Sequence, residues 1–137
     1  MRIGVVGSMQ VTERMIEAAE ELKRRGHDAF VLSVFAEEYV GKTDEEKEVL
    51  KLDHKNNFDA MRVDCERIKD VDAVLALNVE KSGIPNYIGG NAFLELGYAH
   101  ILNKKIYLLN PIPEIPFYKT ELIAMQPVIL DGDLSKV

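Results

Sequence analysis

The sequence alternates short apolar runs with helix-like segments five times along its 137 residues. Continuous apolar runs of this length are typical of parallel strands that are buried on both faces, and the helical segments between them can act as right-handed crossovers. The pattern therefore predicts a flavodoxin-like, three-layer α/β sandwich built on a doubly wound, parallel five-stranded sheet. The five expected strands cover residues 3–6, 29–34, 73–77, 106–109 and 128–130.

Helix signals fill the intervals between these runs. Thr12 suits the N-cap of a first helix, and Gly26 supplies its stop. Residues 37–57 are strongly charged and predict a mobile, partly helical flap. Further helices are expected over residues 91–102 and 120–125. The helix after the flap should lay a single apolar stripe against the sheet, formed by Phe58, Met61, Cys65 and Ile68.

Composition excludes several classes of protein. A net charge of -6 argues against a partner that is a nucleic acid polymer, which requires a clustered basic surface. The single cysteine, Cys65, has no partner for an intramolecular disulfide and no neighbouring ligands for a metal site. The first apolar run is too short for a signal peptide or a membrane span. We expect one cytoplasmic domain over residues 1–137.

Ligands of doubly wound sheets bind at the carboxyl ends of the strands, near the point where the strand order reverses. Three loops are expected there: residues 7–11, residues 78–90 and the chain from Asn110 onward. The turn Gly7-Ser8-Met9 has the composition of a turn that holds a phosphate or a sugar hydroxyl through backbone N–H groups and the Ser8 hydroxyl. A parallel strand also needs a small-residue turn at this position, so both interpretations stay open.

Known nucleotide motifs do not fit the first turn. It lacks the third glycine of the dinucleotide fingerprint and the Gly-Lys-Ser/Thr of a triphosphate loop. A phospho-receiver would need acidic residues after the first and third strands, where the chain has Gly7-Ser8 and Asn78. Flavin binding is a weaker alternative, because the chain has no Trp to stack on the ring.

The most informative segment is Gly89-Gly90-Asn91-Ala92-Phe93-Leu94-Glu95-Leu96-Gly97-Tyr98-Ala99. A double glycine opens the helix and allows a ligand to approach the backbone closely. Glu95 is the one carboxylate among apolar residues near the start of this helix, where the helix dipole should stabilise its ionised form. It is the candidate catalytic residue, although a glutamate that only complements a helix N-terminus would look the same.

This segment, followed by a Lys-Lys-Ile strand, resembles the Glu-Leu-Gly-x-Ala helix of the nucleoside 2-deoxyribosyltransferase superfamily, which includes deoxynucleotide N-glycosidases. The Gly7-Ser8-Met9 turn is similar too. In that family the matching glutamate attacks C1′ of deoxyribose and forms a covalent glycosyl-enzyme, which a second base or water then resolves. The resemblance implies this nucleophilic role for Glu95, on a deoxynucleoside or a deoxynucleoside 5′-monophosphate.

The resemblance also implies roles for the surrounding residues. The turn Gly7-Ser8-Met9 and Asn91 would hold sugar or phosphate beside the close approach at Gly89 and Gly90. Asn78 would face the base, and Tyr87 would stack on it or pack over the glycine turn. No metal and no organic cofactor are implied. The expected partner is a small nucleoside or nucleotide, and the family implies a homodimer or larger homo-oligomer whose sites are completed by a neighbouring chain.

One departure from the family pattern keeps alternatives open. Family members often carry an acidic residue a few positions before the nucleophile, but residues 86–91 contain none. A non-catalytic nucleotide-binding module of the same fold is therefore the main alternative. Asp72 could donate a proton to the departing base, but it is expected at the start of the third strand, at the end of the sheet away from the ligand-binding loops. His54 and Lys55 are expected on a solvated helix face, and His100 is expected to be structural.

Overall fold

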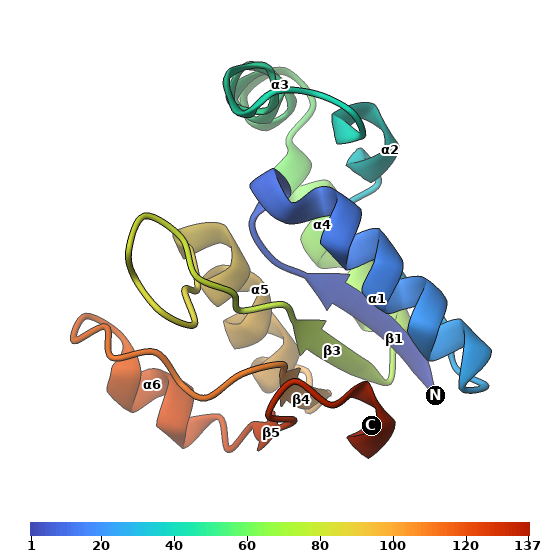
Figure 1. Cartoon of the computed structure of the whole chain (residues 1–137), viewed down its shortest axis with the longest axis vertical. Helices are drawn as coiled ribbons and strands as arrows, with labels where there is room; N and C mark the ends of the chain where they lie inside the picture. Colours follow the sequence, from blue (N-terminus) through green and yellow to red (C-terminus); the bar gives the residue numbers. More distant parts are fainter.

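A computed structural model describes all residues, 1–137. Its centre is a sheet of five parallel strands in the order β2-β1-β3-β4-β5 (Figure 1). The order reverses between β1 and β3, as in the flavodoxin-like fold, so the expected three-layer α/β fold is confirmed. The strands are β1 (Arg2–Val6), β2 (Asp28–Val31), β3 (Ala73–Ala76), β4 (Lys105–Leu108) and β5 (Val128–Ile129).

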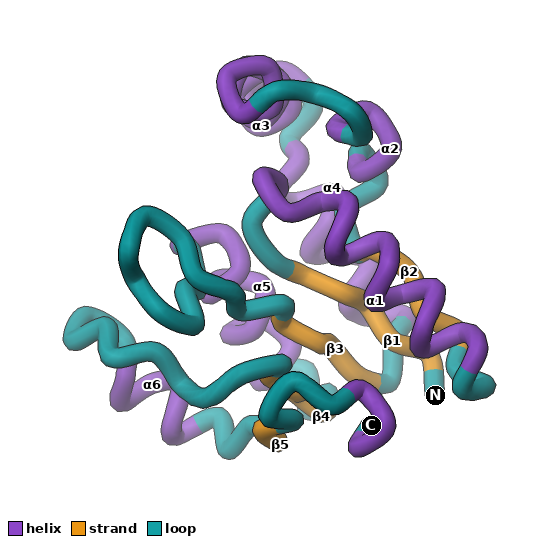
Figure 2. The backbone as a smooth tube through the Cα atoms, in the orientation of Figure 1, coloured by secondary structure: helices purple, strands orange, loops and turns teal.

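Helices connect every pair of successive strands, and a long loop joins β3 to α5 (Figure 2). None of the helices combines the length and the apolar character that a membrane crossing requires. The α-helices are α1 (Thr12–Arg24), α2 (Ala36–Tyr39), α3 (Asp44–Asn57), α4 (Ala60–Glu66), α5 (Gly90–Ile101) and α6 (Lys119–Ala124), and the short 3-10 helices are η1 (Met9–Val11), η2 (Arg67–Asp70) and η3 (Leu134–Lys136).

The two faces of the sheet carry separate apolar cores because successive strand residues point to opposite sides. On β3, Leu75 joins the core under α1, whereas Val74 and Ala76 join the core under α5 and α6. The core under α1 also includes Met15 and Leu22 of that helix. Both faces are therefore covered, which explains why the strands are continuous apolar runs.

Some predicted boundaries are wrong in detail. The second strand ends at Val31 rather than residue 34, because the chain turns there toward α2. Thr12 is the first residue of α1 rather than its N-cap, and its hydroxyl donates to the carbonyl of Met9. Phe58 and Met61 are exposed instead of lying on the sheet. The buried face of this segment consists of Ala60, Asp64 and Ile68.

The charged segment 37–57 folds into α2 and α3, which project beyond the carboxyl edge of the sheet (Figure 1). Thr43 and Glu46 form a capping box at the start of α3. The buried ammonium of Lys47 then joins α3 to the body of the protein, since it donates to the carbonyl of Gln10 and pairs with Glu13 at 2.7 Å. The helices of this segment consequently form one wall above the sheet edge.

Candidate active site

A cavity of about 150 Å³ lies at the carboxyl ends of β1 and β2. Its walls come from seven parts of the chain: the end of β1 with the turn after it, α1, the segment after β2, α3, α4, the loop before α5 and the start of α5. Residues 78–90 contribute Lys81, Tyr87, Gly89 and Gly90. The loop that begins at Asn110 contributes nothing, so two of the three expected loops meet here.

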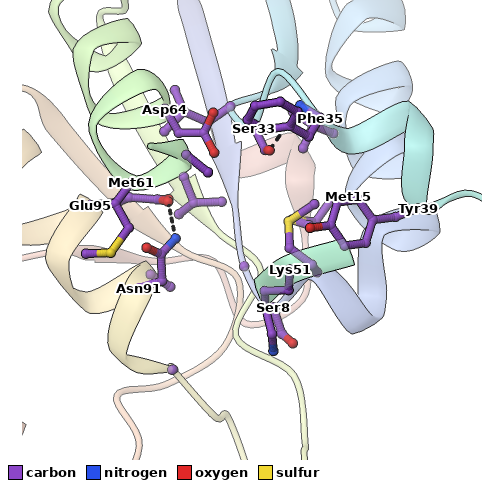
Figure 3. A pocket seen from close by; sticks show the side chains of 18 of the residues that line it. Ser8, Met15, Ser33, Phe35, Tyr39, Lys51, Met61, Asp64, Asn91 and Glu95 are labelled. Carbon is purple, nitrogen blue, oxygen red and sulfur yellow. Dashed lines mark hydrogen bonds between the residues drawn. The ribbon is translucent and has the colours of Figure 1, made fainter. Parts of the chain in front are cut away.

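Glu95 lines this cavity from α5 and is buried, with 6% of its surface exposed. Asn91 lies one turn earlier on the same helix and donates a hydrogen bond of 2.7 Å from Nδ2 to Oε1 of Glu95 (Figure 3). Successive turns of a helix place residues four apart on one face, so both side chains point into the cavity. Asn91 fixes the orientation of the carboxyl group.

The expected stabilisation of ionised Glu95 by the helix dipole is wrong. Glu95 lies beyond the first turn of α5, where the effect of the dipole has faded. Burial, and after it the negative charge of Asp64, raise the pKa of Glu95 to about 8, against smaller opposing effects of Asn91 and Lys55. The carboxyl group therefore retains a proton near neutral pH, which a surface glutamate would not do.

Asp64 is the second carboxyl group of the cavity, and sequence reasoning missed it. It is buried on α4 and accepts a 3.1 Å hydrogen bond from the backbone N–H of Val34. Burial raises its pKa, while the bonds from Val34 and Ser33 lower it. The signal was present in the spacing, because Asp64 falls between Ala60 and Ile68 at steps of four, on the buried face of the segment.

The turn after β1 borders the cavity as expected, with Gly7, Ser8 and Met9 among its lining residues. Gly7 has a packing role: a Cβ there would lie 3.2 Å from Sδ of Met15 and 3.3 Å from the carbonyl oxygen of Leu77. Ser8 caps η1, where its Oγ accepts from the backbone N–H of Gln10 at 3.3 Å. Within this turn, Ser8 therefore has the side chain best placed to form a hydrogen bond with a ligand.

The start of α5 forms the facing wall. A Cβ at Gly90 would meet no atom within 4 Å, so the missing side chain leaves the backbone open to the cavity. A Cβ at Gly89 would lie 3.3 Å from the ring of Tyr87. Tyr87 thus packs against the glycine turn, and it also lines the cavity.

Asn78 does not line the cavity. It is buried, and its side chain is fully engaged with the loop after β4: Nδ2 donates to the carbonyls of Asn110 and Pro111, and Oδ1 accepts from the N–H of Asn110 at 2.8 Å. Asn110 returns a bond to the carbonyl of Asn78. This ring of amide bonds holds two strand ends together, so the expected contact of Asn78 with a base is wrong.

The prediction that His54 lies on a solvated face is also wrong, because residues 37–57 pack over the cavity. His54 is buried and stacks on Phe35, with ring centroids 4.1 Å apart. Its Nδ1 lies 3.0 Å from the hydroxyl of Tyr39, and burial raises the pKa of that hydroxyl to about 12. All three side chains line the cavity, giving it an aromatic wall that the sequence pattern did not reveal.

Comparisons with known proteins give little information about the function of this cavity. No protein-family model matches the chain, and no curated protein matches it. Among solved structures, the CMP N-glycosidase BcmB of Clostridium botulinum is similar at 16% identity, over 94% of this chain and 85% of that chain, with a TM-score of 0.48. A similarity at this identity and TM-score does not indicate a shared chemistry.

Proposed function

We propose that this protein cleaves the N-glycosidic bond of a deoxynucleoside or deoxynucleoside 5′-monophosphate, with Glu95 as the nucleophile. One observation carries the proposal: Glu95 and Asp64 are two buried carboxyl groups that line one cavity, and the negative charge of Asp64 helps to raise the pKa of Glu95. Retaining glycoside cleavage uses two carboxyl groups, one ionised as the nucleophile and one protonated as the acid. The resemblance of the Glu95 helix to the deoxyribosyltransferases supports the same assignment.

Because Glu95 holds its proton near neutral pH, the reactive form is the minor one, in which Glu95 is ionised and Asp64 is protonated. The Glu95 carboxylate attacks C1′, and the C1′–N bond breaks with its electron pair passing to the base. Asp64 gives its proton to the departing base, so the base leaves neutral. Water, or an acceptor base, then attacks C1′ while Asp64 removes its proton, and the bond between C1′ and Glu95 breaks. The pair thereby returns to its starting state.

The position of Asp64 also weakens the main reason for expecting a non-catalytic binding module. That argument rested on the absence of an acidic residue shortly before Glu95 in the sequence. Asp64 offers the acid from a different helix, and Asn91 orients the nucleophile at 2.7 Å. The aromatic wall of Phe35 and Tyr39 offers a surface on which a base can stack.

Chromatography of released base is the direct test. The purified protein is incubated with deoxynucleosides and deoxynucleoside 5′-monophosphates, with and without an acceptor base. We expect base release that is lost in Glu95→Gln and kept in Glu17→Gln, which makes the same change at an exposed site on α1. After an acid quench, mass spectrometry should find a deoxyribosyl adduct on the peptide that contains Glu95. Base release that survives in Glu95→Gln would refute the nucleophile.

We infer self-association from the resemblance, and one surface supports it. Leu94 and Ile101 are exposed two turns apart on α5, and Phe117 is exposed before α6. Because they are two turns apart, Leu94 and Ile101 lie on one face of α5, and exposed apolar side chains on one face are typical of association surfaces. Light scattering should report a homo-oligomer that dissociates in Ile101→Lys, with Val49→Lys on α3 as the matched control. A monomeric wild-type protein would contradict this inference.

A further inference from the structure

Three lysines line the same cavity as the two carboxyl groups: Lys51, Lys55 and Lys81. This is a local concentration of positive charge in a chain whose net charge is -6. Lys51 pairs with Glu48 at 2.8 Å, but neither Lys55 nor Lys81 forms a salt bridge. Two of the three cations therefore have no acidic partner within the protein.

The arrangement is electrostatically unfavourable without a ligand. Burial lowers the pKa of Lys81, and the charges of Lys51 and Lys55 lower it as well, against the opposing charges of Glu48 and Asp44. Like charges near a partly buried group repel more strongly than on an open surface. An anion that entered between the lysines would remove this repulsion, so the cavity favours a negatively charged group.

Ser8 supplies a neutral donor at the same place. Nζ of Lys81 lies 3.3 Å from Oγ of Ser8, and that oxygen also accepts from the N–H of Gln10. A serine hydroxyl has two acceptor positions and one donor hydrogen. Both acceptor positions are occupied, which leaves the Ser8 hydrogen free to donate to an anion beside Lys81.

Part of this cationic group lies away from Glu95, although the charge of Lys55 reaches that carboxyl group. Ser8 and Lys51 lie on the side of the cavity opposite to Glu95 and Asn91 (Figure 3). In a nucleoside 5′-monophosphate the phosphate and C1′ likewise lie on opposite sides of the sugar ring. A sugar that places C1′ at Glu95 can thus extend its 5′ substituent toward Ser8 and the lysines.

We propose that Lys51, Lys55 and Lys81, together with the Ser8 hydroxyl, bind the 5′-phosphate of the substrate, which makes the substrate a nucleoside 5′-monophosphate rather than a nucleoside. The orientation of the sugar rests on the proposed function of Glu95. The affinity for phosphate does not, because it depends only on the charges and donors at the opposite end of the cavity.

Calorimetry on the Glu95→Gln variant separates binding from turnover, since that variant should leave the ligand intact. The ligands are dAMP, dGMP, dCMP and dTMP, the four matching deoxynucleosides, and the corresponding 3′-monophosphates. We expect the best 5′-monophosphate to bind about tenfold to a hundredfold more tightly than its nucleoside and its 3′ isomer, the range for charge-assisted hydrogen bonds. The difference should shrink as salt is added.

The lysines are tested in the same background with Lys81→Met and Lys51→Met. Each should weaken the 5′-monophosphate about tenfold and the nucleoside much less. Lys23→Met makes the same charge change on α1, where Lys23 pairs with Glu20, and should leave both affinities unchanged. Equal affinity for nucleotide and nucleoside, no measurable binding of either, or an equal loss of both in the lysine variants would overturn the phosphate site.

The outcomes distinguish this inference from the proposed function. Phosphate-dependent binding without base release by the wild-type protein would leave the phosphate site standing and refute the glycosidic chemistry. Base release from nucleosides and nucleotides with equal kcat/KM would establish the chemistry and refute the phosphate site.

Discussion

Nδ2 of Asn91 donates a 2.7 Å hydrogen bond to Oε1 of Glu95 within the cavity. It is the side-chain hydrogen bond that the buried carboxyl group receives, and it lowers the pKa of Glu95 against the larger effects of burial and of Asp64. The same bond holds the carboxyl group in one orientation. Asn91 thus acts on both the charge and the position of the proposed nucleophile.

Replacement of Asn91 tests this relationship. In Asn91→Ala, we expect kcat for base release to fall about tenfold, because a hydrogen bond to a charged group contributes about 1.5–3 kcal/mol. The pKa of Glu95 should rise further, which moves the pH profile to higher pH. Asn57→Ala, which removes an exposed amide bonded to Asp53, is the control. An unchanged pH profile would show that Asn91 acts only on ligand binding.

The proposed roles of Glu95 as nucleophile and Asp64 as acid predict a bell-shaped dependence of kcat/KM on pH. At low pH both carboxyl groups are protonated and no nucleophile exists. Above about pH 8 the pair loses its last proton, so the departing base has no acid, and the rate should fall. Rates measured from pH 4 to pH 10 check this directly. A rate that still rises through pH 9 would mean that Asp64 does not donate the proton.

The role of Asp64 can be isolated with the leaving group. Asp64→Asn should slow release of unmodified bases about a hundredfold, within the usual range for general acid catalysis. A 7-methylated purine leaves without protonation and should be released almost as fast as by the wild-type protein. The variant should also lose the fall above pH 8. Asp53→Asn on the exposed part of α3 is the matched control. Equal slowing of both leaving groups would point to a structural defect instead.

Burial of Glu95 has a cost in stability that depends on pH. Its pKa is about 8 in the folded protein and 4.5 in an ordinary environment. The unfolded chain therefore binds fewer protons between these values, and the free energy of unfolding falls as pH rises from about 4.5 to about 8. Glu95→Gln removes this effect and should stabilise the protein at pH 8 by on the order of a few kcal/mol. It should change little at pH 4.

Thermal denaturation of wild type and Glu95→Gln at pH 4, 6 and 8 measures this window. Gln keeps an oxygen that can accept the bond from Asn91, so geometry is largely preserved. Glu17→Gln should show no such pH-dependent difference. Equal Tm shifts at all three pH values would contradict the raised pKa of Glu95.

The sheet was predictable because its evidence is local in the sequence. Each strand is a short apolar run, and the run at residues 73–77 reads as buried on both faces without knowledge of its neighbours. The position of Glu95 was also predictable from the double glycine and the helix that follows. Its ionisation was not, because the burial of Glu95 depends on α4 and other elements that pack against α5 only in the folded chain.

The remaining site residues illustrate the same limit. Asp64 and His54 are polar residues in segments whose charged neighbours suggest a solvated surface. Only tertiary packing of α3 and α4 over the sheet edge buries them. Asn78 shows the reverse, since a polar residue at a strand end suggests a ligand contact, whereas its partners are the distant Asn110 and Pro111.

His54 offers a last test, of how α3 is held over the cavity. Its ring stacks on Phe35 and contacts the Tyr39 hydroxyl, and α3 carries Lys51 and Lys55. His54→Ala should lower the free energy of unfolding by about 2–4 kcal/mol, as for other large-to-small core changes. His54→Phe should recover much of this, because it keeps the stacking and loses only the hydrogen bond with Tyr39 and the 3.4 Å contact of Nε2 with Glu38. His100→Ala, at an exposed site on α5, should change stability by less than about 0.5 kcal/mol.

These variants also separate packing from ligand contact. If His54 acts only by holding α3, then His54→Phe should bind a 5′-monophosphate nearly as well as wild type at temperatures where both are folded. His54→Ala should bind it more weakly, because the lysines of α3 lose their fixed position. Denaturant unfolding and calorimetry at one temperature measure both effects. Weak binding by a stable His54→Phe would instead mean that the imidazole itself contacts the ligand.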